Sequence, residues 1–331
     1  MATTHKTIPP RPRTALITGI TGQDGAYLSE LLVKRGYDVV GLVRGYARAN
    51  TRGLEFLQIE DKVRLVECDL RDLSQVIAII GETKPDEVYN LAAQSSVFQS
   101  FKQPIGTISF NILSVLNILE AIRLIKPDTK FYQASSSEIF GNFSHLPISE
   151  NSAISPINPY GISKASAYWI TKNYRESYGI FSCSGFLFNH ESFLRSENFF
   201  IKKVIRETIK IHNGDVKFLE VGNIDVRRDF GWAPRYVEAM HLMLQQDIPD
   251  DFVICSGKSI SLRAIVEVVF DYFDVPIERL VVRPDLYRPT EIQDIYGDNG
   301  KARRVLGWTY DTSFLETLKI LIKEEIDNSP V

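Results

Sequence analysis

The sequence has few of the residues that build disulfide frameworks and metal centres. Its 331 residues include three cysteines and five histidines. No two cysteines form a C-x-x-C pair and the histidines lack the spacing of metal ligands, so neither a disulfide framework nor a metal site is expected. A reducing cytoplasm, where cysteines stay free, is the expected compartment.

The sequence also lacks a long apolar run and a strong charge of one sign. No apolar stretch approaches the ~20 residues that span a bilayer. The formal net charge is -3, which gives no electrostatic reason to expect nucleic acid or an anionic membrane as a partner. With 44% hydrophobic and 24% charged residues, the chain has the composition of a globular protein with one large core or two smaller ones.

What the sequence does contain is an alternation of short apolar or β-branched runs with amphipathic stretches. The runs predict strands at Thr14–Ile20, Asp38–Val43, Val63–Glu67, Glu87–Leu91, Lys130–Ala134 and Phe181–Phe188. Helical spacing of apolar residues predicts helices at Ala26–Arg35 and Ile108–Ile125. Strands separated by helices pair in parallel through right-handed crossovers. The predicted fold is therefore α/β, a doubly wound parallel sheet of the Rossmann type.

The alternation breaks down after about Asn189, although short strands near Lys217–Val221 and Phe252–Ile254 and a final helix at Phe314–Ile326 are expected. We predict a dinucleotide-binding domain over residues 14–188. A smaller C-terminal α/β lobe over residues 189–331 is expected to bind substrate and to return partly to the first domain. Residues 1–13 are polar, contain proline and lack an apolar signal core, so they are expected to form a flexible leader.

A glycine-rich turn follows the first predicted strand and opens the first predicted helix. Gly19, Gly22 and Gly25 have the spacing G-x-x-G-x-x-G. Glycine lets the backbone turn tightly and approach a pyrophosphate closely, while the start of the helix offers unpaired N–H groups to the anion. A glycine-rich turn without a ligand is the alternative, which the flanking strand and helix disfavour.

The end of the second predicted strand indicates which dinucleotide binds. An acidic residue there would hold the ribose 2′-hydroxyl of NAD, whereas an arginine accommodates the 2′-phosphate of NADP. The strand is followed by Arg44, Arg48 and Arg52, and the next acid is Glu55. NADP is therefore favoured over NAD, with arginines that merely cover a loop as the alternative. Asp69-Leu70, after the third strand, is placed to border the adenine.

Two candidate catalytic groups lie on one predicted helix. Tyr160 and Lys164 have the spacing Tyr-x-x-x-Lys, which puts both side chains on one helix face, one turn apart. We expect the ammonium to lower the pKa of the phenol, so that Tyr160 acts as a base near neutral pH. Tyr168 and Lys172 repeat the spacing. Because Asn158-Pro159 places Tyr160 at the start of the helix, Tyr168 is expected to be structural.

Two further candidates follow the fifth predicted strand, at the carboxyl end where open α/β sheets bind ligands. Ser136 is placed to hydrogen-bond Tyr160 and a sugar hydroxyl. Glu138, if partly buried beside the nicotinamide, could abstract or return a carbon-bound proton. A glutamate that only caps a turn is the alternative, which the neighbouring Tyr/Lys pair makes less attractive.

Several longer stretches match one family. They are Ala15–Leu28, Tyr89–Ser95, Phe131–Ser135, Tyr168–Thr171, Asn173–Gly179, Leu187–Ser192, Arg228–Gly231, Arg288–Glu291 and Arg304–Trp308. The chain from about residue 14 to 325 resembles the GDP-mannose 4,6-dehydratase family of the extended short-chain dehydrogenase/reductase superfamily. The stretch Leu187–Ser192 is far more specific than the generic superfamily motifs.

The resemblance implies a redox-neutral dehydration of a GDP-sugar with NADP as cofactor. In this family NADP⁺ takes hydride from C4 of the sugar while the tyrosine accepts the O4 proton. The 4-keto group then makes the C5 proton acidic enough for the glutamate to remove it, water leaves from C6, and the hydride returns to C6. The product is the GDP-4-keto-6-deoxy sugar. A homo-oligomer, either a dimer or a tetramer, is expected.

The resemblance also implies the site residues, with Ser136, Glu138, Tyr160 and Lys164 as the catalytic group. The implied cofactor-binding residues are Gly19, Gly22, Gln23, Asp24, Gly25, Arg44, Asp69, Leu70, Leu91, Ala93, Tyr160, Lys164, Leu187, Asn189 and His190. The implied substrate-binding residues are Ser95, Glu138, Asn189, Lys203, Arg228, Arg288 and Glu291. Of these, the arginines suit the diphosphate and Glu291 suits a ribose or base.

Departures from the family pattern keep other reactions open. Ser136 stands where the family has threonine, Asn111 where it has aspartate, Phe193 where it has proline, and Gly45 where it has a second arginine. The substrate could be another GDP-hexose or heptose. A nucleotide-sugar 4-ketoreductase, a C4 epimerase or a decarboxylase would use the same Tyr/Lys pair. A non-catalytic dinucleotide sensor is disfavoured because such proteins usually lack that pair.

Overall fold

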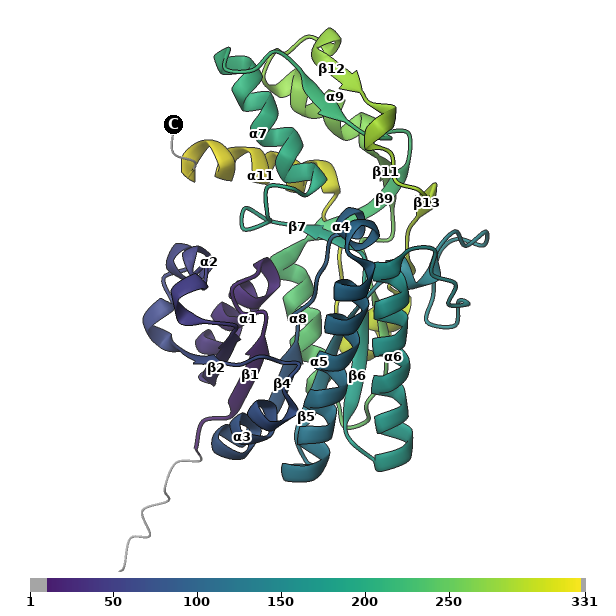
Figure 1. Cartoon of the computed structure of the whole chain (residues 1–331). Helices are drawn as coiled ribbons and strands as arrows, with labels where there is room; N and C mark the ends of the chain where they lie inside the picture. Colours follow the sequence, from purple (N-terminus) through teal and green to yellow (C-terminus); the bar gives the residue numbers. More distant parts are fainter. Residues whose placement is uncertain (1–10, 329–331) are drawn as a thin grey trace, which may run out of the picture.

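The chain is built around one parallel sheet (Figure 1). The computed structural model describes residues 11–328, so residues 1–10 of the expected leader lie outside the described range. The strands of the sheet are β1 (Thr14–Thr18), β2 (Asp38–Val43), β3 (Val63–Glu67), β4 (Glu87–Asn90), β5 (Lys130–Ser136), β6 (Ser182–Leu187) and β10 (Phe252–Ile254). Their order is β10-β6-β5-β4-β1-β2-β3. All neighbouring pairs are parallel, which confirms the predicted doubly wound α/β fold.

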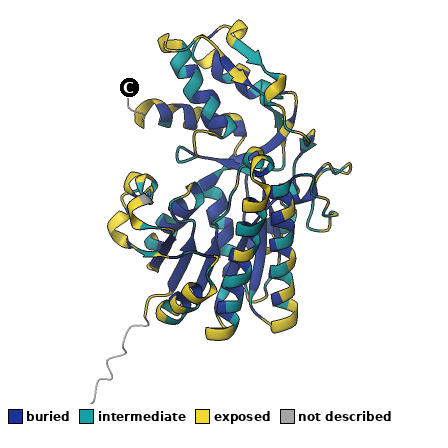
Figure 2. Ribbon diagram, viewed as in Figure 1, coloured by how far each residue is buried: buried dark blue, intermediate teal, exposed yellow. Residues whose placement is uncertain are grey.

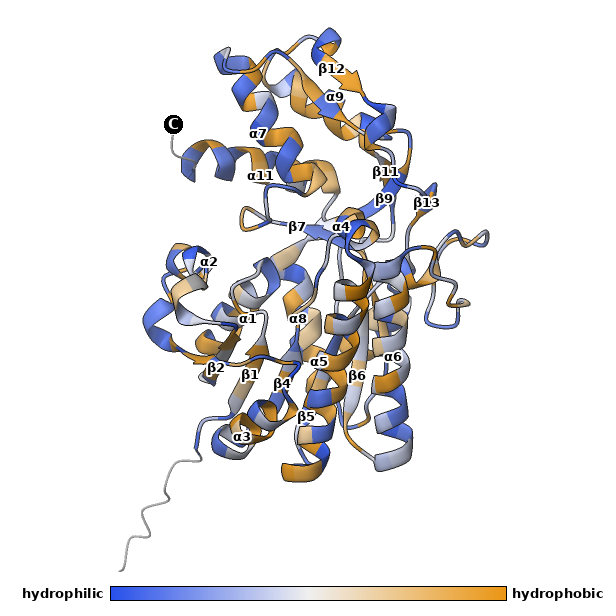
Figure 3. Ribbon diagram, viewed as in Figure 1, coloured by the Kyte–Doolittle hydropathy of each residue, from blue (hydrophilic) through white to orange (hydrophobic). Residues whose placement is uncertain are grey.

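Successive residues of the strands point to opposite faces, and different helices cover the two faces. On one face these are α1 (Gln23–Lys34), α8 (Ala233–Leu244) and α10 (Gly300–Leu306), and on the other α3 (Leu73–Thr83), α5 (Pro104–Ile125) and α6 (Pro159–Tyr178). Ala15 and Ile17 of β1 pack toward the first set, and Leu16 packs toward the second. The strands form the buried centre in Figure 2, and the apolar residues of Figure 3 lie mainly along them and the helices.

Helix α5 is the one described helix that is long and apolar enough to cross a membrane by length and composition alone, a test that core helices also pass. In this fold it packs against both α3 and α6. Val115 and Leu119 are among its residues buried in the core. We therefore assign α5 to the core of the fold. Its outer face nevertheless stays exposed at Ile105 and Leu113.

Most of the remaining elements form a smaller lobe at the carboxyl edge of the sheet (Figure 1). They are β7 (Asn189–Glu191), α7 (Phe200–Asn213), β8 (Leu219–Val221), β9 (Arg227–Trp232), β11 (Ser259–Ser261), α9 (Leu262–Tyr272), β12 (Leu280–Val282), β13 (Asp294–Ile295) and α11 (Phe314–Asn328). Strand β9 pairs with β7, β11 and β13, and β8 pairs with β12. Helices α7, α9 and α11 enclose a separate apolar cluster. The domain boundary near residue 188 stays a prediction.

Some element ends differ from the predicted ends for local reasons. Strand β1 stops at Thr18 because Gly19 has a φ of +72°, a left-handed conformation that glycine adopts without strain. Helix α1 begins at Gln23, three residues before the predicted Ala26. Strand β5 continues through Ser136. The last residue of the strand is therefore a candidate catalytic residue, and the strand itself fixes its backbone.

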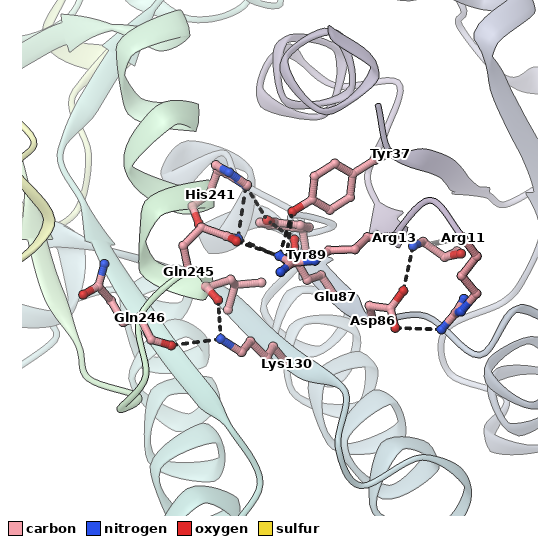
Figure 4. A network of polar contacts seen from close by, with 12 residues as sticks. Arg11, Arg13, Tyr37, Asp86, Glu87, Tyr89, Lys130, His241, Gln245 and Gln246 are labelled. Carbon is pink, nitrogen blue, oxygen red and sulfur yellow. Dashed lines mark hydrogen bonds and ion pairs between the residues drawn. The ribbon is translucent and has the colours of Figure 1, made fainter. Parts of the chain in front are cut away.

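A polar network that includes the buried Glu87 lies at the start of β4, the amino-terminal end of that strand (Figure 4). The Glu87 carboxylate, 2% exposed, accepts hydrogen bonds from the hydroxyls of Tyr89 at 2.7 Å and Tyr37 at 3.0 Å. It also accepts one from Gln245 at 3.0 Å, and the Arg13 guanidinium lies 3.4 Å away. Because a buried carboxylate needs such donors, the network ties the end of α8 and the start of the chain to β4.

Candidate active site

A cavity of about 1090 Å³ lies over the carboxyl ends of β1, β2, β3 and β4. The sequence-predicted residues that line it are Gly19, Gly22, Gln23, Asp24, Gly25, Arg44, Asp69, Leu70, Leu91, Ala93 and Ser95. The other predicted cofactor residues are outside this lining, namely Tyr160, Lys164, Leu187, Asn189 and His190. The cavity occupies the edge at which open α/β sheets bind dinucleotides.

The glycine turn fits a pyrophosphate by the shape of its backbone. A Cβ added at Gly25 would lie 2.3 Å from the Gly19 carbonyl oxygen, so only glycine lets α1 start this close to β1. Gly22, at the start of α1, provides no side-chain cap for the helix. The first N–H groups of α1 therefore remain available to an anion, which is the arrangement that binds phosphates at helix N-termini.

Gln23 and Asp24 also connect the turn to β7 and the residues that follow it. The Asp24 carboxylate lies 2.9 Å from Nε2 of His190. The Gln23 amide donates to the His190 carbonyl at 3.1 Å and accepts from the Ser192 hydroxyl at 2.8 Å. These contacts fix the wall of the cavity by joining α1 to a segment more than 160 residues away in sequence.

His190 has acceptors on both ring nitrogens. Its Nδ1 lies 2.7 Å from the Phe188 carbonyl oxygen, and its Nε2 faces the Asp24 carboxylate. Both nitrogens can donate only in the imidazolium form. Burial lowers the pKa of His190, but the charge of Asp24 and the hydrogen bond with it outweigh burial and leave that pKa raised. Burial likewise opposes ionisation of Asp24, whose pKa is nevertheless lowered by His190.

The far end of the cavity contains both a cation and an acid. The Arg44 guanidinium lies 5.6 Å from the centre of the Phe110 ring. Glu67, at the end of β3, also lines the cavity, and its carboxylate accepts the N–H of Tyr46 at 2.6 Å. Sequence reasoning missed Glu67 because it searched for an acid after β2 and not on the neighbouring strand. The bond to Tyr46 holds the loop that follows Arg44.

The remaining predicted residues of this end differ in their surroundings. Asp69 accepts hydrogen bonds from Arg71 at 2.7 and 3.0 Å, which lower the pKa of Asp69 to about 2. Arg52 is exposed on α2 (Arg52–Phe56). The side chain of Arg48 lies outside the described part of the chain. Because its pKa is low, Asp69 is an ionised group at the cavity wall.

The four predicted catalytic residues come from the end of β5 and the start of α6. Tyr160 is 9% exposed and Lys164 is 3% exposed. Nζ of Lys164 donates to the Ala134 carbonyl at 2.8 Å and lies 5.9 Å from the centre of the Tyr160 ring. Ser136 and Glu138 are both close enough to affect the pKa of Tyr160.

We expected Lys164 to lower the pKa of the Tyr160 phenol, and for the protein without ligands this expectation is wrong. Burial raises the pKa of Tyr160 to about 12, and the Ser136 hydroxyl opposes that shift only in part. Burial also lowers the pKa of Lys164 to about 8, against the attraction of Asp24. Desolvation disfavours both charged forms, and the sequence spacing could not reveal how deeply the pair is buried.

Glu138 does not cap the turn in which it lies. The Ser136 hydroxyl caps the short 3-10 helix Ser137–Phe140 and accepts the Glu138 N–H at 3.2 Å. The Glu138 carboxylate is half-buried and accepts a hydrogen bond from the Asn158 amide at 2.7 Å. Tyr168, which repeats the Tyr-x-x-x-Lys spacing, instead packs in an apolar cluster with Phe186 at 5.1 Å between ring centres.

The lobe contributes a cluster of charges near Glu138. The buried Arg228 donates to Glu291 at 2.7 Å, and Arg288 donates to the same oxygen at 3.2 Å. Burial lowers the pKa of Arg228, and the charges of Glu138 and Glu291 are the largest opposing influences. Arg228, Arg288 and Glu291 therefore form a paired cluster of charges on the side of the lobe that approaches Glu138.

The other predicted substrate residues of the lobe have backbone partners. Nζ of Lys203 donates to the Glu220 carbonyl at 2.7 Å. The Asn189 amide lies 3.4 Å from the Asp229 carbonyl. The structure therefore does not bring Lys203 into the cluster formed by Arg228, Arg288 and Glu291.

Sequence reasoning missed Arg195, which lines the same cavity as the glycine turn. It pairs with Glu191 at 3.4 Å and stacks over Phe199 at 3.6 Å. Its loop is held where Phe193 packs at a tilt against Phe56, with 4.8 Å between ring centres. The signal in the sequence was a lone arginine just beyond the motif that contains His190.

Comparison with known proteins identifies the family. Residues 16–321 match the family model described as GDP-mannose 4,6 dehydratase. GDP-mannose 4,6 dehydratase from Drosophila melanogaster is 39% identical, over 96% of this chain and 87% of the relative. The Homo sapiens enzyme of the same name is 40% identical, over 96% of this chain and 92% of the relative. The chain belongs to the GDP-mannose 4,6-dehydratase family.

Solved structures support the fold of this family member. dTDP-glucose 4,6-dehydratase from Streptomyces venezuelae, with NAD bound, has a TM-score of 0.86 at 18% identity, over 95% of this chain and 97% of that chain. RMD from Pseudomonas aeruginosa, with NADPH bound, has a TM-score of 0.76 at 24% identity, over 96% of this chain and 99% of that chain. Proteins of this fold thus hold either dinucleotide.

We predict that the ion pair of Asp24 and His190 stabilises the fold most at mildly acidic pH. The contribution of Asp24 is present above its ordinary value of 3.8, and that of His190 is present below 6.5 and is lost as the pH rises through the raised pKa of His190. His190→Gln should therefore reduce the free energy of unfolding by on the order of 1–3 kcal/mol more at about pH 5.5 than at about pH 9.

Urea denaturation at the two pH values measures this difference. The exposed His145, which lies in the loop before Pro147, offers the matched control His145→Gln. An equal loss of stability at both pH values in His190→Gln would show that the pair is not charged in the folded protein.

Proposed function

We propose that this chain is an NADP-dependent GDP-mannose 4,6-dehydratase that converts its substrate to the GDP-4-keto-6-deoxy sugar. The observation that carries the proposal is the position of Glu138 beside Tyr160 and Lys164, in a chain about 40% identical to curated dehydratases over nearly its whole length. A dehydrogenase needs only the Tyr/Lys pair. The added carboxylate supplies the second base that water elimination requires.

In the first half of the reaction, Tyr160 accepts the proton of the sugar O4 hydroxyl. The Ser136 hydroxyl, fixed at the end of β5, orients that oxygen by a hydrogen bond. Lys164 keeps positive charge near the phenol at neutral pH. When bound, NADP⁺ supplies the acceptor for the C4 hydride, which later returns to C6.

In the second half, Glu138 removes the C5 proton that the C4 ketone has made acidic. The electron pair left at C5 expels the C6 hydroxyl, which leaves as water after taking a proton from the Glu138 carboxyl group. The carboxylate is thereby restored. When hydride returns to C6, C5 takes up one proton, and the proton that Tyr160 took from O4 balances it. In this order of steps the half-buried Glu138 serves first as the base and then as the acid, and the Asn158 amide holds it in place.

Charges on the lobe support a nucleoside diphosphate sugar as the substrate. We assign Arg228 and Arg288 to the diphosphate, because a guanidinium binds phosphate oxygens in pairs. In the structure both arginines donate hydrogen bonds to one oxygen of Glu291. When the diphosphate takes the two arginines, the Glu291 carboxylate would instead bind a ribose or base. We place Ser95, Asn189 and Lys203 around the same substrate, Lys203 after its bond to Glu220 breaks.

Arg44 supports NADP over NAD as the cofactor. It is the cation at the end of β2 that lines the cavity. The nearest acid on the neighbouring strand, Glu67, is engaged by the Tyr46 N–H and is therefore less available to a ribose hydroxyl. Gly45, where relatives are expected to have a second arginine, leaves Arg44 as the main phosphate contact of this loop.

We also propose that the enzyme is a homodimer formed through α5 and α6, with the cytoplasm as its compartment. On α6, Ile162 and Trp169 are 43% and 52% exposed and lie seven residues apart, on one face of the helix. The neighbouring α5 exposes Leu113. A second copy of this apolar surface is the simplest partner.

The three buried free cysteines suit the cytoplasm, and cell fractionation would test that assignment.

We predict that purified protein with NADP⁺ converts GDP-mannose to a product lighter by one water, without net formation of NADPH. Mass spectrometry and absorbance measure the two quantities. Stoichiometric NADPH would indicate a simple dehydrogenase, and a product of unchanged mass an epimerase.

Variants assign the steps. Glu138→Gln should still oxidise C4 but eliminate water about a hundredfold more slowly or worse. Tyr160→Phe should block oxidation, so that no bound NADPH appears after mixing. Tyr168→Phe, at the repeated spacing, is the matched control and should stay active.

We predict that the protein binds NADP more tightly than NAD. Loss of a charge-assisted phosphate contact costs on the order of 1.5–3 kcal/mol, so Arg44→Ala should weaken NADP binding by roughly tenfold to a hundredfold and leave NAD binding unchanged. Arg64→Ala, which removes an exposed cation of β3 that pairs with Glu82, is the control. Equal dissociation constants for the two cofactors in the wild-type protein would refute the assignment.

We predict that Trp169→Glu reduces the oligomer to a smaller species, because a charge on this apolar surface would be buried without a partner. Sedimentation velocity measures the mass of wild type and variant. Tyr272→Glu, at an exposed aromatic residue on α9 of the lobe, should leave the mass unchanged. A monomeric wild-type protein would contradict the proposed dimer.

A further inference from the structure

The first turn of α6 is joined to the candidate base Glu138 by one buried amide. Asn158, 3% exposed, precedes the helix and caps it. Its Oδ1 accepts the Gly161 N–H at 2.7 Å, and its Nδ2 donates to Oε2 of Glu138 at 2.7 Å. The same side chain thus satisfies an unpaired helix N–H and contacts the carboxylate.

The two hydrogen bonds fix the orientation of the Asn158 amide. Its oxygen must face the Gly161 N–H, which can only donate, so its NH₂ group must face the Glu138 carboxylate, which can only accept when ionised. The backbones are also in close contact. A Cβ added at Gly161 would lie 2.6 Å from the Glu138 carbonyl oxygen. Glu138, Asn158 and the turn that contains Tyr160 therefore form one rigid unit.

The amide also distinguishes the two oxygens of the Glu138 carboxylate. Oε2 accepts a hydrogen bond from the NH₂ group of Asn158. This group can only donate, so it cannot take up a proton from the carboxyl group. A proton taken from carbon is then best placed on Oε1, after which Oε2 still accepts from Asn158. Arg228 of β9 and Tyr160 of α6 both lie close enough to the same carboxylate for its charge to affect their pKa values.

We infer that Asn158 is a positioning residue for the elimination step, because it holds the Glu138 carboxylate by Oε2 and presents Oε1 to the C5 proton of the sugar. This inference rests on the proposed dehydratase function. In that step the C5–H bond breaks, the proton goes to Oε1, the electron pair expels the C6 oxygen, and the same proton leaves with that oxygen as water. Asn158 exchanges no atom with the substrate.

The role can be separated from helix capping by a change that keeps only the cap. Asn158→Ser retains an oxygen acceptor for the Gly161 N–H, but its side chain is too short to reach Glu138. C4 oxidation, seen as the burst of bound NADPH on mixing with GDP-mannose, should be retained. Elimination should slow by about tenfold to a hundredfold, because small misplacement of a reacting group costs this much, and KM should change little.

Further variants control for the cap. The isosteric Asn158→Asp also keeps the cap and removes the donor, so it should show the same defect in elimination if the serine variant is poorly folded. Asn158→Ala loses both contacts and should lower the thermal unfolding midpoint. The control Ser261→Ala removes the cap of α9, where Ser261 accepts the Ala264 N–H at 3.2 Å, and should lower the midpoint without changing the ratio of the two steps.

The outcomes separate this inference from the function on which it rests. A wild-type enzyme that releases no water overturns both. If the wild-type enzyme dehydrates GDP-mannose but the serine and aspartate variants eliminate water at its rate, only the positioning role is wrong. If oxidation and elimination slow equally in those variants, Asn158 acts on the helix as a whole and the inference is again overturned.

Discussion

The relation between the sheet and the lobe depends on one buried carboxylate. Asp229 of β9 is fully buried, and burial raises its pKa to about 6. It accepts hydrogen bonds from the N–H and the hydroxyl of Ser256 at 2.8 and 2.6 Å and from the N–H of Gly257 at 2.9 Å. These donors follow β10 of the main sheet. A carboxylate in this position needs all of them, so β9 is held at the carboxyl edge, where its residue Arg228 comes under the influence of the charge of Glu138.

The same edge then removes water from the reacting groups. Burial makes the Tyr160 phenol harder to ionise and the Lys164 ammonium easier to neutralise. At neutral pH the chain alone therefore keeps its phenol protonated, so the proposed role of Tyr160 as a base requires that ligands change its surroundings. Glu138 lies nearer the surface, half-buried, and its carboxylate accepts a hydrogen bond from the Asn158 amide. One site thus combines a deeply buried phenol with a carboxylate that an amide donor holds in place.

Local patterns were enough to predict six strands of the sheet, the glycine turn and the structural role of Tyr168, because each depends on neighbouring residues. The sequence could not reveal features set by distant partners. The short strand β9 exists through pairing with β7, β11 and β13, and helix α8 covers the sheet by packing on α1, β5 and β6. The pairing of Asp24 with His190 spans 166 residues. The depth of burial that reverses the expected phenol shift is likewise a property of the whole fold.

Three of the four departures from the family pattern, at Asn111, Phe193 and Ser136, have partners inside this chain. The Asn111 amide accepts the Gln94 N–H at 2.9 Å and donates to the Gln94 carbonyl at 3.2 Å and to the Ser163 hydroxyl at 2.9 Å. An ionised aspartate could not donate in this way, so the asparagine is matched to its surroundings. Phe193 packs at a tilt against an aromatic residue of α2, and Ser136 keeps the hydroxyl that caps the turn containing Glu138. None of these three changes removes a group to which the proposed dehydration assigns a role.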